Sequence, residues 1–198
     1  MAITLDEIAE QIRACKRCRL HEGRKNAVPG EGLAEKGIML VGEAPGEKED
    51  EEGRPFVGPA GKQLTKALEK LGINRAKDAF ITNVVKCRPP GNREPLDDEV
   101  EACLPYLLAQ IKAVRPKVIV ALGAHSAKAL LSAAGRRIEK LSEARGRCYA
   151  ATIAGVSTTI CVTYHPAATL YNPRLRDAFE NDLAKFLGRR DEGLLKYL

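Results

Sequence analysis

The stretch from Gly42 to Leu64 combines residue types that suit a ligand-binding loop. It contains five glycines, a carboxylate at Glu43 and the aromatic ring of Phe56, which no apolar periodicity assigns to a core. Glycine permits backbone conformations and close approaches that a side chain would forbid. A ring outside a core is free to stack on a ligand. A nucleoside triphosphate loop is excluded, because Gly61-Lys62 is not followed by Ser or Thr.

Two further polar side chains, Asn83 and His165, stand at the ends of other apolar runs. An amide is unfavourable inside a strand unless it is used, and its one acceptor and two donors can match the edge of a pyrimidine. In an open α/β sheet, ligands bind beyond the carboxyl ends of the strands. We therefore expect Glu43, Phe56, Asn83 and His165 to share one crevice.

Four cysteines have the chemistry of a metal site. Cys15 and Cys18 form a C-x2-C pair, Cys87 follows a predicted strand, and Cys103 lies in a predicted helix. The chain begins without a secretion signal, so a disulfide framework is not expected. Four thiolates can hold a tetrahedral zinc ion or a [4Fe-4S] cluster, and the spacing does not choose between them. Four small buried side chains are the structural alternative.

The elements that must position these residues follow from hydrophobic periodicity. Apolar runs predict strands at 38–42, 79–85 and 117–123 and a hairpin of 147–153 with 156–163. Amphipathic patterns predict helices at 4–14, from about 59, at 96–114, from 124 and at 173–188, followed by a short tail. Thr4 and Glu7 form a predicted capping box, His125 is interpreted as a helix-start residue, and the acidic run 47–52 is expected in a solvated loop.

The predicted hairpin places Cys148 opposite Cys161 if its turn is Ala154-Gly155. A disulfide and two packed thiols are both compatible with that register. We prefer two packed thiols, because the cytosol is reducing.

The whole chain has 198 residues and is expected to form one domain, 1–198. No run of about 18 apolar residues occurs, so a soluble, cytoplasmic protein without a membrane partner is expected. The net charge of +6 permits a polyanionic partner. Two basic patches, in 13–25 and 86–93, are either contacts to such a partner or solvated faces.

Three strings in this chain resemble one enzyme family. GEAPG-x-x-ED-x-x-G-x-PFVG-x-AG, TNVVKCRPPGNR and HPAATLYNPR are similar to motifs of the family 4 uracil-DNA glycosylases, the iron-sulfur members of their superfamily. The likeness runs from the first cysteine pair to about residue 187. It implies an α/β/α sandwich around a four-stranded parallel sheet, and a [4Fe-4S] cluster held by Cys15, Cys18, Cys87 and Cys103.

The resemblance also implies hydrolysis of the N-glycosidic bond of a deoxyuridine flipped out of DNA, which releases uracil and leaves an abasic site. Phe56 would stack on the base, Asn83 would read its edge, and His165 would donate to its O2. Glu43 would orient the attacking water or screen the sugar cation. The other implied contacts are Gly42 and Ala44 near the base, Glu49 as a supporting carboxylate, Lys86, Arg88 and Arg93 on phosphates, and Leu170 filling the vacated stack.

The expected partner is uracil-containing DNA, single- or double-stranded, with a sliding clamp as a further candidate. A monomer associated with a prokaryotic nucleoid is expected. One alternative is a non-catalytic iron-sulfur protein of the same fold that binds DNA or a polymerase. A covalent uracil-DNA trap would need a histidine after Arg136-Arg137-Ile138, where this chain has Glu139. A glycosylase with broader base specificity is the third alternative.

Overall fold

Five strands form one sheet in the order β2-β1-β3-β5-β4. The structure, a computed structural model, describes residues 3–188. The strands are β1 (Ile38–Gly42), β2 (Ala79–Asn83), β3 (Val118–Leu122), β4 (Cys148–Ile153) and β5 (Val156–Thr163). The first three and β5 run parallel, and β4 pairs antiparallel with β5 at the sheet edge.

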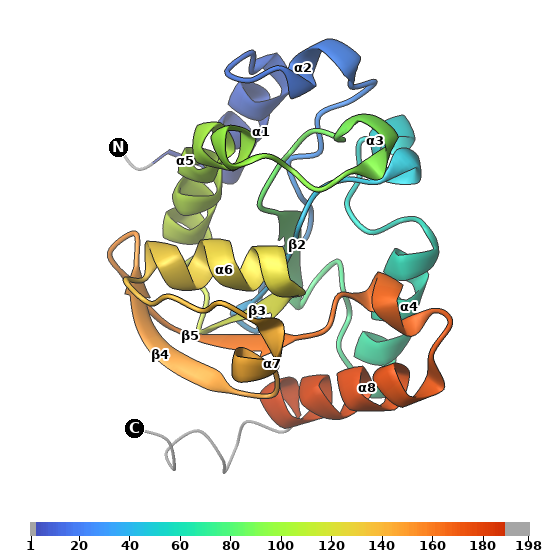
Figure 1. Ribbon diagram of the computed structural model, residues 1–198. Coiled ribbons are helices and arrows are strands. Elements are labelled where there is room, and N and C mark those ends of the chain that lie inside the picture. Colours follow the sequence, from blue (N-terminus) through green and yellow to red (C-terminus); the bar gives the residue numbers. More distant parts are fainter. Residues whose placement is uncertain (1–2, 189–198) are drawn as a thin grey trace.

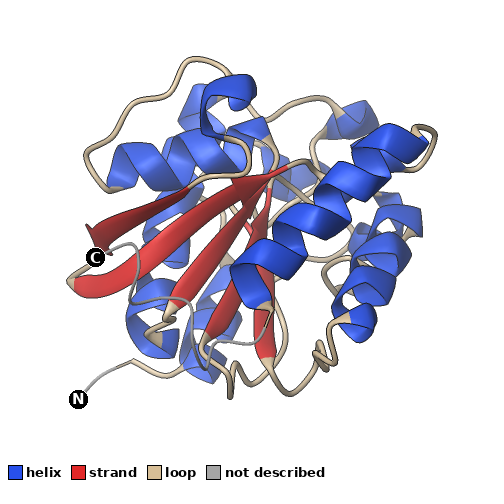
Figure 2. Cartoon of the chain, turned by 90° about the horizontal axis from the view of Figure 1, so that it is seen from below, coloured by secondary structure: helices blue, strands red, loops and turns tan. Residues whose placement is uncertain are grey.

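Helices cover both faces of this sheet (Figures 1 and 2). The α-helices are α1 (Leu5–Ala14), α2 (Leu20–Gly23), α3 (Glu47–Glu52), α4 (Pro59–Lys70), α5 (Asp97–Val114), α6 (Ala124–Ala133), α7 (Leu141–Ala144) and α8 (Pro173–Leu187). Two short 3-10 helices, η1 (Pro90–Asn92) and η2 (Pro166–Thr169), follow β2 and β5.

Alternating residues of the interior strand β1 divide the core into two layers. In β1, Ile38 and Leu40 pack with α4 and α8, whereas Met39 and Val41 pack with α5 and α6. This alternation is the two-residue period of a strand buried on both faces. The predicted three-layer α/β/α sandwich is confirmed, and its four parallel strands carry a fifth, antiparallel strand that comes from the predicted hairpin.

The strand register brings the ends of distant segments to one sheet edge. Gly42 pairs with Asn83 at the carboxyl ends of β1 and β2, and Leu122 pairs with Thr163 at those of β3 and β5. The strands that follow β1 in sequence, β2 and β3, lie on its two sides, so the chain reverses direction across the sheet at β1. Ligand sites of open α/β sheets lie at such a switch point.

Two predictions about the helices are tested directly by the structure. The capping box is confirmed, because Glu7 N donates to Thr4 Oγ1 and Thr4 N donates to Glu7 Oε2. The prediction of a loop at 47–52 is wrong, because these residues form α3. Gly53 ends that helix in the left-handed conformation, and acidic residues in its first turn suit the helix dipole. The predicted tail after 188 lies outside the described residues.

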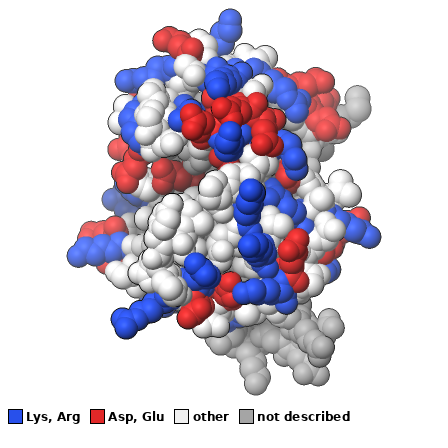
Figure 3. Space-filling view, turned by 90° about the vertical axis from the view of Figure 1, so that its right-hand side faces the viewer, with Lys and Arg blue, Asp and Glu red and all other residues white. Residues whose placement is uncertain are grey.

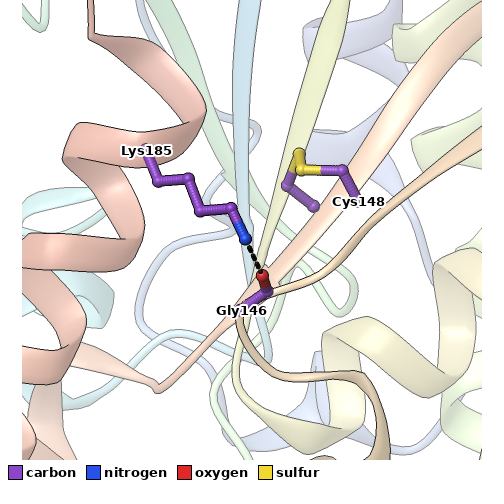
Figure 4. The surroundings of a disulfide bond; sticks show 4 residues. Gly146, Cys148 and Lys185 are labelled. Atoms are coloured by element: carbon purple, nitrogen blue, oxygen red, sulfur yellow. Dashed lines mark hydrogen bonds between the residues drawn. A yellow bond between two sulfur atoms is a disulfide. The ribbon is translucent and has the colours of Figure 1, made fainter. Parts of the chain in front are cut away.

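The preference for two packed thiols at Cys148 and Cys161 is also wrong. The two residues pair across the β4–β5 ladder with their Cα atoms 4.0 Å apart, and their sulfur atoms form a disulfide. The predicted register was correct, and it places the two sulfur atoms within bonding distance. The preference for thiols had relied on the redox state of the cytosol and not on this geometry. Figure 4 shows this disulfide beside Gly146, whose carbonyl accepts a 2.8 Å hydrogen bond from Lys185 Nζ of α8.

None of the helices in residues 3–188 is both long and apolar enough to cross a membrane.

Candidate active site and cysteine cavity

A cavity of about 320 Å³ opens at the carboxyl edge of the sheet. Its wall includes the last residue of β2 and residues from the loops that follow β1, β2 and β5. The structure thus brings together most of the residues predicted to act in catalysis or to contact the base. They are Glu43, Ala44, Glu49, Phe56, Asn83 and His165.

Gly42 lies at the point where two of these side chains meet. A Cβ atom built on Gly42 would stand 2.3 Å from Asn83 Oδ1 and 2.5 Å from Phe56 Cζ. Real Cβ atoms do not approach other atoms so closely, and both neighbours are buried. Only glycine at this position lets the amide and the ring occupy the same wall.

The amide of Asn83 is buried and incompletely paired. The residue is 2% exposed, and its Oδ1 has no hydrogen-bond partner among the residues that the structure describes. Leaving a buried acceptor unpaired costs about 1–3 kcal/mol. Because the side chain also lines the cavity, the oxygen is placed to accept a hydrogen bond from a ligand.

Phe56 belongs to the core and to the cavity wall at once. It packs in the cluster beneath α4 and is 5% exposed, while its ring lines the cavity. Its backbone is left-handed, with φ of +50°. Glu49 supports the next two residues, since its Oε1 accepts hydrogen bonds from Val57 N and Gly58 N at 2.9 and 2.8 Å.

His165 is held as a neutral hydrogen-bond donor. Burial lowers its pKa to about 4, although the nearby charge of Glu49 acts in the opposite direction. Its Nδ1 accepts a 3.2 Å hydrogen bond from Ala167 N, and this contact assigns the ring hydrogen to Nε2. The imidazole lies 5.7 Å from the Phe56 ring, centroid to centroid.

Glu43 is half-buried, and burial raises the pKa of its carboxyl group. His125 Nε2 lies 3.9 Å from Glu43 Oε2 and 3.2 Å from Glu94 Oε1, and the histidine lowers the Glu43 pKa against the burial effect. The interpretation of His125 as a helix-start residue holds, because His125 is the second residue of α6. Its proximity to Glu43 was missed, although its place just after β3 puts it at the same sheet edge.

The predicted phosphate contact of Lys86 is wrong. The residue is 1% exposed, and its Nζ donates to Thr82 Oγ1, Asn83 O and Gln110 Oε1 at 2.5–2.7 Å. Burial lowers the pKa of this amine to about 7. Lys86 therefore lies inside the protein, below the strand end that carries Asn83.

The two neighbouring arginines remain at the surface. Arg93 lines the cavity and forms a bidentate pair with Glu99, with nitrogen–oxygen distances of 2.8 and 2.6 Å. Arg88 Nε donates to Asn92 Oδ1. Leu170 is half-buried at the end of η2, and the next residue, Tyr171, is 94% exposed. The sequence interpretation passed over Tyr171, the fully exposed aromatic residue of this loop.

Part of the predicted basic patch in 13–25 makes contacts within the chain. Arg19 pairs with Asp98, and Lys25 pairs with Glu51. The face in Figure 3 likewise shows acidic and basic side chains intermingled around a largely uncharged area. The net positive charge is therefore not gathered into one stripe on that face.

A second cavity is lined by all four cysteines predicted as ligands: Cys15, Cys18, Cys87 and Cys103. They are free thiols that come from the end of α1, the loop after β2, and α5. Arg24 Nη1 donates to Cys87 Sγ at 3.0 Å, and Lys86 N donates to Cys103 Sγ at 3.3 Å. Burial raises the pKa of Cys103 to about 11, so a bound metal would have to stabilise its thiolate.

Within residues 3–188, no three His, Cys, Asp or Glu side chains are placed to hold a single metal ion. The donor set nevertheless fits an iron-sulfur cluster in kind. Four thiols face one cavity, and N–H groups donate to two of the sulfurs, an arrangement that tunes such clusters.

Comparisons with known proteins agree with this geometry. Residues 29–187 match the family model described as the uracil DNA glycosylase superfamily. The chain is 59% identical to a type-4 uracil-DNA glycosylase of Pyrobaculum aerophilum over 184 residues, which cover 93% of each chain. It is 51% identical to the type-4 enzyme of Saccharolobus solfataricus, with 91% of this chain and 84% of the relative covered.

A third relative, the type-4 uracil-DNA glycosylase of Archaeoglobus fulgidus, is 43% identical over 198 residues and covers 98% of this chain and 99% of its own length. The predicted resemblance is thus confirmed at both levels, that of the superfamily and that of the type. The chain belongs to the uracil DNA glycosylase superfamily and, within it, to the type-4 group.

Proposed function

We propose that this protein is a uracil-DNA glycosylase that hydrolyses the N-glycosidic bond of a deoxyuridine flipped out of DNA. The observation that carries the proposal is the buried Oδ1 of Asn83, which has no hydrogen-bond partner within residues 3–188 and lies in a cavity shared with an aromatic ring and a neutral imidazole. The type-4 relatives, named as uracil-DNA glycosylases, support the same reaction.

Base recognition would rest on Asn83 and Phe56. Uracil N3–H would donate to Asn83 Oδ1, and uracil O4 would accept from the Asn83 amide nitrogen. Cytosine lacks the N3 hydrogen and carries an amino group at the 4-position, so it would leave both groups of Asn83 mismatched. Phe56 would stack on the flipped base, a contact worth about 1–3 kcal/mol.

Bond cleavage would separate charge, and two side chains would stabilise the separated charges. The glycosidic electrons leave with uracil, where negative charge develops on O2, and His165 Nε2–H would donate to that oxygen. Its low pKa keeps the imidazole a neutral donor. Glu43, as a carboxylate, would orient the water that attacks C1′ or screen the cationic sugar, while Gly42 and Ala44 would supply the backbone around the base.

DNA contacts would surround the cavity. Flipping the nucleotide costs a few kcal/mol, which phosphate contacts by Arg88 and Arg93 and a side chain in the vacated stack would offset. Leu170 is our candidate for that position, and Tyr171 beside it extends the same loop into solvent. Glu49 would act indirectly, through the backbone after Phe56.

The four cysteines would hold a [4Fe-4S] cluster with a structural role. The cluster would supply a rigid link between α1, α5 and the loop after β2, and no step of the hydrolysis needs it. Lys86 N and Arg24 would donate to its sulfur ligands.

The reaction is tested by incubating the protein with an oligonucleotide that contains one uracil, followed by alkali. Strand scission at the uracil is expected, and a matched oligonucleotide with thymine at that position should stay intact. Absence of scission with freshly prepared, brown protein would overturn the proposal and favour a non-catalytic DNA-binding role. A monomeric state, a clamp partner and action at the nucleoid remain predictions.

A further inference from the structure

Arg75 binds the backbone of the loop that carries Phe56. Its Nη1 donates to Phe56 O at 2.8 Å and to Thr65 Oγ1 at 2.9 Å. Its Nη2 donates to Pro55 O at 2.7 Å and to Glu31 Oε1 at 2.9 Å. Each terminal nitrogen of a guanidinium carries two hydrogens, so all four terminal N–H groups of Arg75 are used.

The loop held in this way is under conformational constraint. Phe56 adopts φ of +50°, a region that a bulky side chain rarely occupies without support from its surroundings. The following helix lies tightly against it, since a Cβ atom built on Gly61 would stand 1.9 Å from Phe56 O. Arg75 fixes the two carbonyls at 55–56, and Glu49 fixes the next two N–H groups.

Through hydrogen bonds, the same guanidinium also connects the Phe56 loop to the strand that carries Asn83. Glu31, which accepts from Arg75, pairs with Ile81 of β2 through N–O hydrogen bonds of 3.0 and 2.8 Å. Asn83 follows Ile81 by two residues on that strand. A path of direct contacts therefore runs from the backbone of Phe56, through Arg75 and Glu31, to the strand that ends at Asn83.

We propose that Arg75 is a positioning residue for recognition of the flipped uracil, a role that rests on the function proposed above. Phe56 lines both an open groove and the base cavity, whereas Arg75 lines only the groove. Arg75 therefore acts on the base indirectly, through the Phe56 backbone that positions the ring. The planar fork of arginine is needed, because a single ammonium cannot donate to two carbonyls, a hydroxyl and a carboxylate at once.

The test is a double-mutant cycle of Arg75→Gln with Phe56→Ala, measured as kcat/KM on a uracil-containing oligonucleotide and as inhibition by free uracil. We expect Arg75→Gln alone to lower kcat/KM and to weaken uracil inhibition, each roughly tenfold, because a displaced ring binds the base poorly. In the Phe56→Ala background the same substitution should change both by less than about twofold.

Arg54→Gln is the matched control. Arg54 also donates to Glu31, with Nε–Oε2 at 2.8 Å, and lines the same groove, yet it makes no hydrogen bond to Pro55 or Phe56. Its kcat/KM should stay within about twofold of the parent. Arg75→Lys should be as impaired as Arg75→Gln, and full activity of Arg75→Lys would refute the need for the fork.

A tenfold loss that persists when Phe56 is alanine would overturn the inference, because Arg75 would then act by another route. If Phe56→Ala itself leaves uracil binding unchanged, the stacking role in the proposed function fails instead. Circular dichroism checks that each variant folds. Should Arg75→Gln not fold, Thr65→Val removes one acceptor of Nη1, and a two- to threefold loss that vanishes without Phe56 is expected. An unchanged kcat/KM of Thr65→Val would also overturn the inference.

Discussion

At the scale of single residues, position 42 has no room for a side chain. In Gly42→Ala, the new methyl group would overlap the Asn83 amide and the Phe56 ring, so both side chains, or the backbone at residue 42, must move. A displacement of about 1 Å in a binding wall can cost 10²-fold in rate, and we expect a loss of that order in kcat/KM.

Gly23→Ala is a suitable control for this substitution, because a Cβ atom there meets no atom of the described part of the chain within 4 Å. Its activity and melting temperature should match those of the parent. Full activity of Gly42→Ala would show that the wall is less rigid than its contacts indicate.

His165 gives a second prediction at the residue scale, on the pH dependence of stability. Its pKa of about 4 in the folded protein lies below the ordinary value of 6.5. The unfolded chain therefore takes up this proton first as the pH falls, and the contribution of His165 to stability is lost between about pH 6.5 and pH 4. For this half-buried side chain we expect roughly 1–3 kcal/mol.

The measurement is the free energy of unfolding in guanidinium chloride at pH 7 and pH 4, for the parent and for His165→Asn. The parent should lose more stability than the variant by the stated amount. Equal losses in the two proteins would contradict the assignment of a half-buried, neutral imidazole.

The β4–β5 hairpin carries the prediction at the element scale. Its disulfide closes a loop with a sequence separation of 13 residues and ties the edge strand to the parallel sheet. For a loop of this length, cross-linking stabilises by about 3 kcal/mol in the chain-entropy account. Replacement of both Cys148 and Cys161 by alanine should lower the free energy of unfolding by that order.

A phosphine reductant provides the control for the hairpin. It should destabilise the parent to the level of the double variant and leave the double variant unchanged, because the four other cysteines form no disulfide that it could reduce. If the free energy of unfolding of the parent does not change with the reductant, a stabilising role of the disulfide is contradicted.

At the scale of the whole molecule, the four-cysteine cavity lies where the N-terminal helix packs against the rest of the chain. Ile8 and Ile12 of α1 pack with Tyr106 of α5, next to the same cavity. We expect Cys87→Ala to lower iron content, melting temperature and DNA affinity more than the rate of the chemical step. Single-turnover rates at saturating enzyme, compared with binding titrations, separate these effects. Unchanged melting and binding with a lost chemical step would contradict a structural cluster.

Much of the fold and of the candidate site could be predicted from the sequence alone. Local patterns are enough for the elements, because apolar period and capping residues act over a few neighbours, as Thr4 with Glu7 and the buried run 38–42 show. They also predicted the shared wall of Asn83 and His165, since parallel strands place their carboxyl ends at one edge. The family motifs added the type of enzyme.

Tertiary structure alone decided which charged groups are internal and what holds the binding loop. From the sequence, Lys86 was predicted to contact phosphate at the surface, beside Arg88. It is buried instead, where Thr82 and Gln110 supply acceptors for its amine. The sequence assigned no role to Arg75, yet its side chain holds the backbone of Phe56, 19 positions away. No periodicity relates such partners, because a long polar side chain finds its acceptors only after the segments have packed.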